Sequence, residues 1–262
     1  MKSTLCLFLA SLMTTTATAA TPPVPPDAAK HPHVVKAPFG ATRNDDYYWL
    51  RDDKRGNKDM LAYLQAENAY ADQLLAPLKP LEDTLYKEIV GRIKQDDSSV
   101  PARERGYWYY SRFETGQDYP IHARRKGSME AAEEILLDVN AMAAGKGYFS
   151  VGSMEVSQDN QLLAWADDDV GRRQYTIRFK DLATGKVLPD VITGSSGDLV
   201  WADDNRTVLY VENDPETLLT VRVKKHVLGT AASADTIVYE EKDDSFYMGI
   251  GRTRDDRFIT IG

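Results

Sequence analysis

A short motif recurs three times in the second half of the chain, and its spacing limits the folds that this sequence can adopt. Each copy has an Asp-rich turn followed by an apolar, strand-like segment. The turns contain Asp159, Asp204 and Asp256, which lie 45 and 52 residues apart. Four-stranded units that repeat about every 40 to 50 residues are typical of β-propeller blades. The sequence therefore predicts a mainly β chain that is built from such blades.

The number of blades follows from the length of the repetitive region. Residues 96–262 provide room for about three and a half blades, whereas propellers close with about four to eight. The sequence ends within a strand-like segment at Ile261 and Gly262. We therefore expect an incomplete propeller, whose open blade edge takes up further propeller segments or a second copy of the chain.

Two hairpins are predicted in the β region from alternating patterns on either side of glycine turns. They comprise residues 107–113 and 119–124 around the turn 114–118, and residues 174–180 and 186–188 around the turn 183–185. The one helix that the sequence suggests in this half lies near residues 129–133.

A helical extension is predicted in residues 57–95, before the propeller. The first helix begins at a cap formed by Asn57 or Asp59 and ends at Pro77, and a second helix begins at Pro80. Apolar side chains then recur every four residues, which predicts a helix face buried against another part of the protein. These residues are Leu81, Leu85, Ile89 and Ile93.

The first 19 residues have the pattern of a secretory signal peptide. Lys2 precedes a short apolar run, and small residues follow at 17–20 (ATAA). We expect cleavage after Ala19 or Ala20 and export to the periplasm or beyond. Residues 20–56 form a Pro-rich linker and an extended segment. The only cysteine, Cys6, lies in the signal, and no later apolar run is long enough to predict a membrane partner.

Charge argues against nucleic acid as a partner. The chain contains 32 Lys and Arg against 40 Asp and Glu, a net charge of −8, whereas duplex-binding proteins are usually basic. Aromatic and basic residues do alternate between Trp108 and Lys126, as in single-strand binders. In an acidic chain we interpret them as the two faces of a hairpin.

No catalytic, cofactor-binding or metal-binding residue is predicted in the chain. Residues 194–197 (GSSG) lack the G-x-S-x-G spacing of a nucleophile elbow and are interpreted as a loop between blades. His122 and His226 lie in strand-like segments, and no Ser or Asp can be paired with either from the sequence. Two further clusters are interpreted as surface features, a segment with His31 and His33 and a solvated turn with Asp167, Asp168 and Asp169.

Several segments resemble the prolyl oligopeptidase family of serine peptidases, and in particular its oligopeptidase B branch. The resemblance covers the chain from about His31 to its end, in the same order. It rests on residues 45–53 (DDYYWLRDD), 63–70 (YLQAENAY), 87–93 (KEIVGRI), 172–179 (RRQYTIRF) and 237–244 (IVYEEKDD). Members of this family combine a helical extension, a seven-bladed propeller and a C-terminal α/β-hydrolase domain.

The resemblance implies that the intact protein cleaves short peptides, after Lys or Arg in the oligopeptidase B branch. It also implies that residues 96–262 are a partial propeller, truncated before the hydrolase domain that carries the Ser, Asp and His triad. We therefore expect an N-terminal portion that is catalytically silent alone. The alternative is a non-enzymatic propeller module that binds a peptide or a separately encoded hydrolase.

Overall fold

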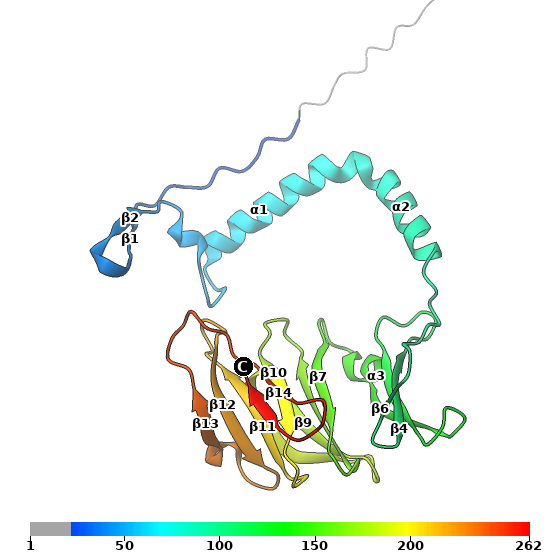
Figure 1. Ribbon diagram of the computed structural model, residues 1–262. Helices are drawn as coiled ribbons and strands as arrows, with labels where there is room; N and C mark the ends of the chain where they lie inside the picture. Colours follow the sequence, from blue (N-terminus) through cyan, green and yellow to red (C-terminus); the bar gives the residue numbers. More distant parts are fainter. Residues whose placement is uncertain (1–21) are drawn as a thin grey trace, which may run out of the picture. The chain divides into compact units, whose positions relative to one another are not determined.

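The computed structural model describes residues 22–262 (Figure 1). The chain divides into two compact units, one that ends at Arg92 and one that begins at Ile93. The first contains the helices and the second contains most of the strands. The predicted signal peptide, residues 1–19, lies outside the described residues.

The N-terminal unit begins with a small hairpin and continues into two helices. Strands β1 (Val34–Lys36) and β2 (Thr42–Asn44) pair on either side of the 3-10 turn η1 (Pro38–Gly40), and the 3-10 turn η2 (Tyr48–Leu50) follows. Helix α1 (Lys58–Leu75) leads through the 3-10 turn η3 (Ala76–Leu78) into α2 (Lys79–Gly91). The side chain of Asn57 accepts hydrogen bonds from the backbone N–H groups of Asp59 and Met60, so the predicted cap and both predicted helices are confirmed.

The predicted apolar stripe of α2 is exposed in this structure. Leu81, Leu85 and Ile89 of α2, and Ile93, which lies beyond the end of the helix, retain between 47% and 60% of their accessible surface. In the described part of the N-terminal unit, the only buried hydrophobic side chain is that of Met60. The unit therefore carries almost no core of its own, and its helices offer an apolar face.

The second unit consists of antiparallel, four-stranded blades (Figure 1). The first blade contains β3 (Ala102–Glu104), β4 (Tyr107–Arg112), β5 (Ile121–Lys126) and β6 (Glu133–Asp138). The next two share one seven-stranded sheet, with β7 (Ser150–Val156), β8 (Leu162–Asp168), β9 (Tyr175–Asp181), β10 (Val187–Trp201), β11 (Thr207–Asn213), β12 (Thr220–Val227) and β13 (Thr236–Glu240), and the 3-10 turn η4 (Ala232–Ala234) between the last two. A two-stranded sheet of β14 (Ile250–Arg252) and β15 (Ile259–Ile261) follows. Three blades and half of a fourth therefore form an array that does not close, as the repeat predicts.

Strand β10 joins the second and third blades without a break. Its first half pairs with β9 and its second half with β11, and Ser195 pairs with both Tyr175 and Glu212. The loop predicted at residues 194–197 is therefore wrong. Gly194 and Gly197 have φ angles of +74° and +101°, which glycine adopts without strain, and this lets the strand bend from one blade into the next.

The three predicted repeat turns adopt the same backbone conformation. Asn160, Asn205 and Asp256 have φ angles of +63°, +54° and +59°, a left-handed conformation that Asn and Asp tolerate better than most residues. The third copy is shifted by one residue, because Asp255, rather than Asp256, is equivalent to Asp159 and Asp204. Each turn links the innermost strand of a blade to the next strand outward.

The helix suggested near residues 129–133 is wrong. After Gly127 the chain makes a single turn, in which the N–H of Ala131 bonds to Ser128 O at 3.3 Å. Glu133 then starts β6 opposite Arg125, so strand pairing overrides the local helix propensity. A short helix, α3 (Val139–Ala143), instead follows β6 and is capped by the side chain of Asp138.

Two apolar clusters fill the second unit. One packs Phe179 and Trp201 with side chains of β8 to β11, and the other packs Leu136 and Phe149 with side chains of β6 to β8. No helix in residues 22–262 is long and apolar enough to cross a membrane.

Candidate functional site

His122 has one serine partner, in the first blade. Its Nδ1 lies 2.8 Å from Ser111 Oγ, on the neighbouring strand. Burial lowers the pKa of His122. No carboxylate bonds to this imidazole among the described residues, so the pair lacks the third group that orients the base in a catalytic triad.

His226 is fully buried between two carboxylates in the third blade. Its Nδ1 lies 2.8 Å from Asp235 Oδ1 and its Nε2 lies 3.2 Å from Asp190 Oδ1. Tyr210 donates a further bond to Asp235 at 2.9 Å, and burial with this bond raises the pKa of Tyr210 far above its usual value. Because both ring nitrogens contact carboxylates, none is left to activate a serine, and the network joins β10, β11, β12 and the η4 turn.

Asp167 and Asp168 do not form the predicted solvated turn. They end β8 and are 5% and 2% exposed. Asp167 accepts bonds from Trp165 Nε1 and Arg178 Nε, and Asp168 accepts backbone N–H bonds from Val170, Gly171 and Arg173. Burial acts to raise the pKa of Asp168, but these N–H donors outweigh it and hold the pKa below its usual value. The carboxylates fix the β8–β9 loop.

His31 and His33 are held by aromatic neighbours in the N-terminal unit. The His33 ring stacks on that of Tyr48 with centroids 4.0 Å apart, and the His31 ring lies 5.3 Å from that of Trp49. Within residues 22–262, no group of three or more His, Cys, Asp or Glu side chains could hold a metal ion.

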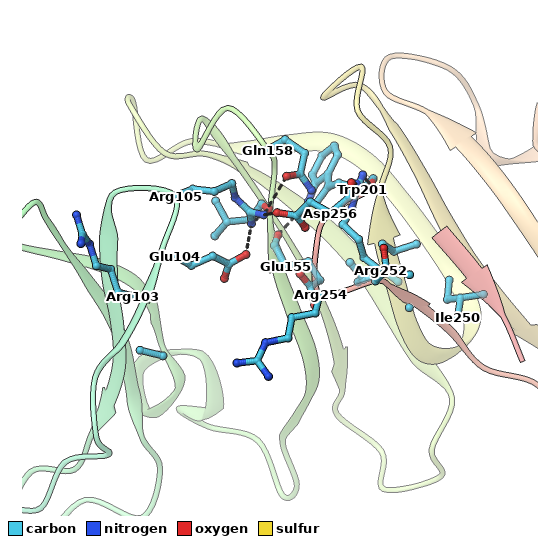
Figure 2. A pocket seen from close by; sticks show the side chains of 16 residues that line it. Arg103, Glu104, Arg105, Glu155, Gln158, Trp201, Ile250, Arg252, Arg254 and Asp256 are labelled. Carbon is cyan, nitrogen blue, oxygen red and sulfur yellow. Dashed lines mark hydrogen bonds and ion pairs between the residues drawn. The ribbon is translucent and has the colours of Figure 1, made fainter. Parts of the chain in front are cut away.

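A pocket of about 540 Å³ lies where the innermost strands of the three blades and of the half blade meet (Figure 2). It is lined by residues of β3, β7, β10 and β14 and of the turns that follow them. Most of the labelled side chains are charged, as Figure 2 shows. We treat this pocket as the candidate functional site, because convergent polar groups in a concave surface are the usual mark of a binding site.

Two arginines cross-link the blades at the floor of the pocket. Arg105, from the first blade, bonds to Gln158 Oε1 at 2.9 Å and pairs with Glu104 at 2.7 Å and with Asp256 at 3.4 Å. Arg252, from the half blade, pairs with Asp203 at 2.5 Å. The buried Nε atoms of both arginines lack an acceptor among the described residues, so the floor has more donors than acceptors.

Glu155 lies on β7 beside these arginines. Its side chain reaches solvent, but the surrounding pocket walls remove much of its hydration, and this desolvation raises its pKa to about 7. Glu104 adds to the increase by charge repulsion, whereas Arg105 and Arg252 oppose it. The net charge of the pocket therefore changes near neutral pH.

The pocket residues were not identified by sequence reasoning, although a signal for them exists. Glu155 and Arg252 each lie shortly before a copy of the repeated Asp turn, and Arg105 lies in the corresponding turn between β3 and β4, which is not one of the three copies. A charged side chain at this position belongs to the innermost strand of its blade or to the turn that follows it. Without the fold, however, nothing indicates that the innermost strands meet.

Comparison with known families gives a match over most of the chain. The family described as "Prolyl oligopeptidase, N-terminal beta-propeller domain" matches residues 26–262. A protein named dipeptidyl aminopeptidase BI, from Pseudoxanthomonas mexicana, is 64% identical over 100% of this chain and 39% of its own length. Protease 2 from Moraxella lacunata is 32% identical over 88% of this chain and 34% of its own length.

Solved structures agree with this match. Oligopeptidase B from Leishmania major superimposes with a TM-score of 0.85 and 32% identity, and the match covers 93% of this chain and 36% of that protein. Oligopeptidase B from Trypanosoma brucei gives a TM-score of 0.81 at 29% identity, over 89% of this chain and 35% of that protein. The chain thus spans between about a third and two fifths of the length of these relatives.

Proposed function

The chain belongs to the prolyl oligopeptidase family, and we propose that it forms the N-terminal propeller portion of an exported serine peptidase that cleaves short peptides. The observation that carries this proposal is the family match over residues 26–262, in a chain that spans 39% of its 64% identical relative. The open blade array agrees with such a portion, because the last strands have apolar side chains still to be covered.

We infer that the chain is catalytically silent without further segments. The only Ser–His hydrogen bond in residues 22–262 joins Ser111 and His122, and no carboxylate of these residues bonds to the His122 ring. The other buried imidazole, that of His226, is occupied by two carboxylates. An acyl transfer needs a serine, a base and an oriented carboxylate in one line of hydrogen bonds.

The proposed specificity is cleavage after Lys or Arg. It is what the resemblance to the oligopeptidase B branch implies, and two solved structures that bear that name match this chain at 32% and 29% identity. The relative with 64% identity is named a dipeptidyl aminopeptidase, which favours the release of dipeptides from a free N-terminus. Two fluorogenic dipeptides that end in Arg distinguish cleavage after a basic residue from the release of dipeptides. One has a free N-terminus and the other an acetylated N-terminus.

The test combines this chain with the remaining portion of the P. mexicana relative. We expect no hydrolysis by the chain alone, and hydrolysis of the free-N-terminus substrate when both portions are present. The remaining portion alone is the control for activity that needs no propeller. If both portions together stay inactive while each is folded, the peptidase proposal is wrong and a non-enzymatic binding module takes its place.

Contaminating host peptidase is the main confounder for the chain alone. Ser111→Ala and Ser196→Ala variants separate the two sources, since either would remove an activity that uses that serine. Hydrolysis by the chain alone that a serine-directed inhibitor blocks, and that one of these variants abolishes, would contradict catalytic silence.

Export is proposed from the signal-peptide pattern, which lies outside the described residues. The expected periplasmic product begins at residue 20 or 21. Intact-mass measurement of the periplasmic protein checks this, and a product that begins at Met1 would refute it.

A further inference from the structure

We propose that the pocket between the innermost strands binds a carboxylate group, and that its ligand is the C-terminal carboxylate of a short peptide. The proposal of a carboxylate site is based on the side chains and the charge of the pocket itself. The choice of a peptide as its source rests on the proposed function.

Arg254 supplies the group that receives the carboxylate. Its side chain is exposed and lines the pocket, and its guanidinium makes no hydrogen bond or ion pair with any residue from 22 to 262. Figure 2 shows it extending into the space beside Glu155 and Glu104. A guanidinium that has all its donors available on a concave surface binds a carboxylate through two parallel N–H bonds.

Arg103 provides a second available cation at the rim. It is also exposed, lines the pocket from β3 and has no partner within the described residues. The pocket lining therefore contains two unpaired arginines besides Arg105 and Arg252, which are already paired. Two unpaired guanidinium groups and the unsatisfied Nε atoms of Arg105 and Arg252 leave the pocket with donors to spare.

The charge of the pocket differs in sign from that of the chain. Four arginines line it, at positions 103, 105, 252 and 254, against three acidic residues, at positions 104, 155 and 256. Its net charge is thus positive in a chain with a net charge of −8. Most of the surface repels an anion, so an anionic ligand is directed toward this concave site.

The mixture of charges favours a peptide end over a free inorganic anion. A phosphate would meet repulsion from Glu104, Glu155 and Asp256. A peptide brings backbone N–H donors together with its carboxylate, and can satisfy both kinds of group. The volume of about 540 Å³ lies within the range of about 300 to 1,000 Å³ that is common for small-ligand pockets.

The affinity of the pocket for a carboxylate should depend on pH, because Glu155 gains or loses a proton near neutral pH. The charged and polar groups around it are Arg103, Glu104 and Arg105 from the first blade, Gln158 from the following turn, and Arg252, Arg254 and Asp256 from the half blade. The β10 side contributes the neutral residues Leu199, Val200 and Trp201. The pKa of Glu155 is about 7, so protonation on the acid side of this value removes a negative charge and strengthens carboxylate binding.

The experiment compares N-acetyl-Ala-Ala-Ala with the same peptide as a C-terminal amide, by calorimetry and by NMR of the full chain. The indole N–H of Trp201, which donates to Glu155 O at 3.0 Å, is the local NMR reporter. At pH 6 we expect the acid to bind about fivefold or more tightly than the amide, as expected for a charge-assisted pair of hydrogen bonds. Arg254→Gln should remove this difference.

Two controls make the result specific. Arg43→Gln, in the N-terminal unit, changes the net charge by the same amount and should leave binding unchanged. Glu155→Gln should raise affinity at pH 8 to the value that the wild-type chain has at pH 6. Because the peptide is acetylated, no amine of its own titrates in this range.

Equal binding of acid and amide, or acid binding that Arg254→Gln leaves intact, would overturn the carboxylate site. Acetate that displaces the peptide at equal concentration would keep the carboxylate site and overturn its assignment to a peptide. None of these measurements needs hydrolysis, so failure of the binding proposal is distinct from failure of the peptidase proposal.

Discussion

His226 contacts two carboxylates through its two ring nitrogens, and its removal would leave Asp190 and Asp235 buried without it. We expect His226→Ala to lower the free energy of unfolding by about 3 kcal/mol or more, because the variant adds a cavity to two poorly compensated buried charges. Urea unfolding measures the change. His31→Ala, at an exposed position, should change it by less than about 0.5 kcal/mol, and a loss below about 1 kcal/mol for His226→Ala would contradict a structural role.

Glu155 should make stability depend on pH. Its pKa in the folded protein, about 7, is above the unfolded value of about 4.3, so the folded state holds a proton that the unfolded state loses. Stability then falls as the pH rises from about 4.3 to about 7. We expect Glu155→Gln to raise the melting temperature at pH 8 and to leave it unchanged at pH 4.5. Solvent screening at this accessible site limits the gain to about 1 kcal/mol, and an equal shift at both pH values would contradict the assignment.

At the level of elements, the path of the innermost strands depends on small residues beside Tyr175. A Cβ at Gly152 would lie 2.6 Å from Tyr175 Cε1, and one at Gly197 would lie 3.1 Å from Cδ2 of the same ring. Gly152 also falls at the register shift between β7 and β8. The ring therefore packs directly on the backbone of β7 and β10.

We expect Gly152→Ala to destabilise the second unit by about 1 to 3 kcal/mol, the usual cost of overpacking. In a Tyr175→Ala background the same substitution should cost much less, because the obstructing ring is gone. Gly147→Ala, where a Cβ would meet no atom within 4 Å, is the matched control. Thermal melting of the four variants gives the coupling, and additive effects would show that the ring is not the cause.

The helices, the hairpins and the blade repeat could be predicted, because their signals are local. The Asn57 cap depends only on backbone N–H groups two and three residues further along the chain. The Asp turns need only a short loop between two strands. The β10 link could not be predicted, since glycine is depleted in strands and favoured in turns, so the two glycines at 194 and 197 indicated a loop. Asp167 and Asp168 were misplaced because their N–H, indole and guanidinium partners are visible only after folding.

The pocket was missed for a related reason. Arg105 and Asp256 lie 151 residues apart in the sequence and 3.4 Å apart in the structure. No pattern within one blade reports a contact between two blades. The family resemblance, by contrast, rests on short segments along the whole chain, and comparison with known proteins confirms it.

At the scale of the whole molecule, the half blade leaves apolar side chains exposed. Phe246, Tyr247, Phe258 and Ile261 have exposed fractions of 60%, 78%, 58% and 39%. Burial of each such side chain is worth about 1.5 to 3 kcal/mol, a large part of a typical stability of about 5 to 15 kcal/mol. We expect the chain alone to self-associate or to unfold partly, since exposed strand edges and apolar faces recruit other chains.

Size-exclusion chromatography with light scattering, on the chain alone and mixed with the remaining portion of the P. mexicana relative, tests whether this chain is part of a larger propeller. We expect association of the chain alone and a 1:1 complex in the mixture. An Ile261→Asp variant should prevent that complex, whereas Val170→Asp, at another exposed apolar position, should not. A sharply melting monomer that ignores the added portion would contradict the claim that this chain is part of a larger propeller.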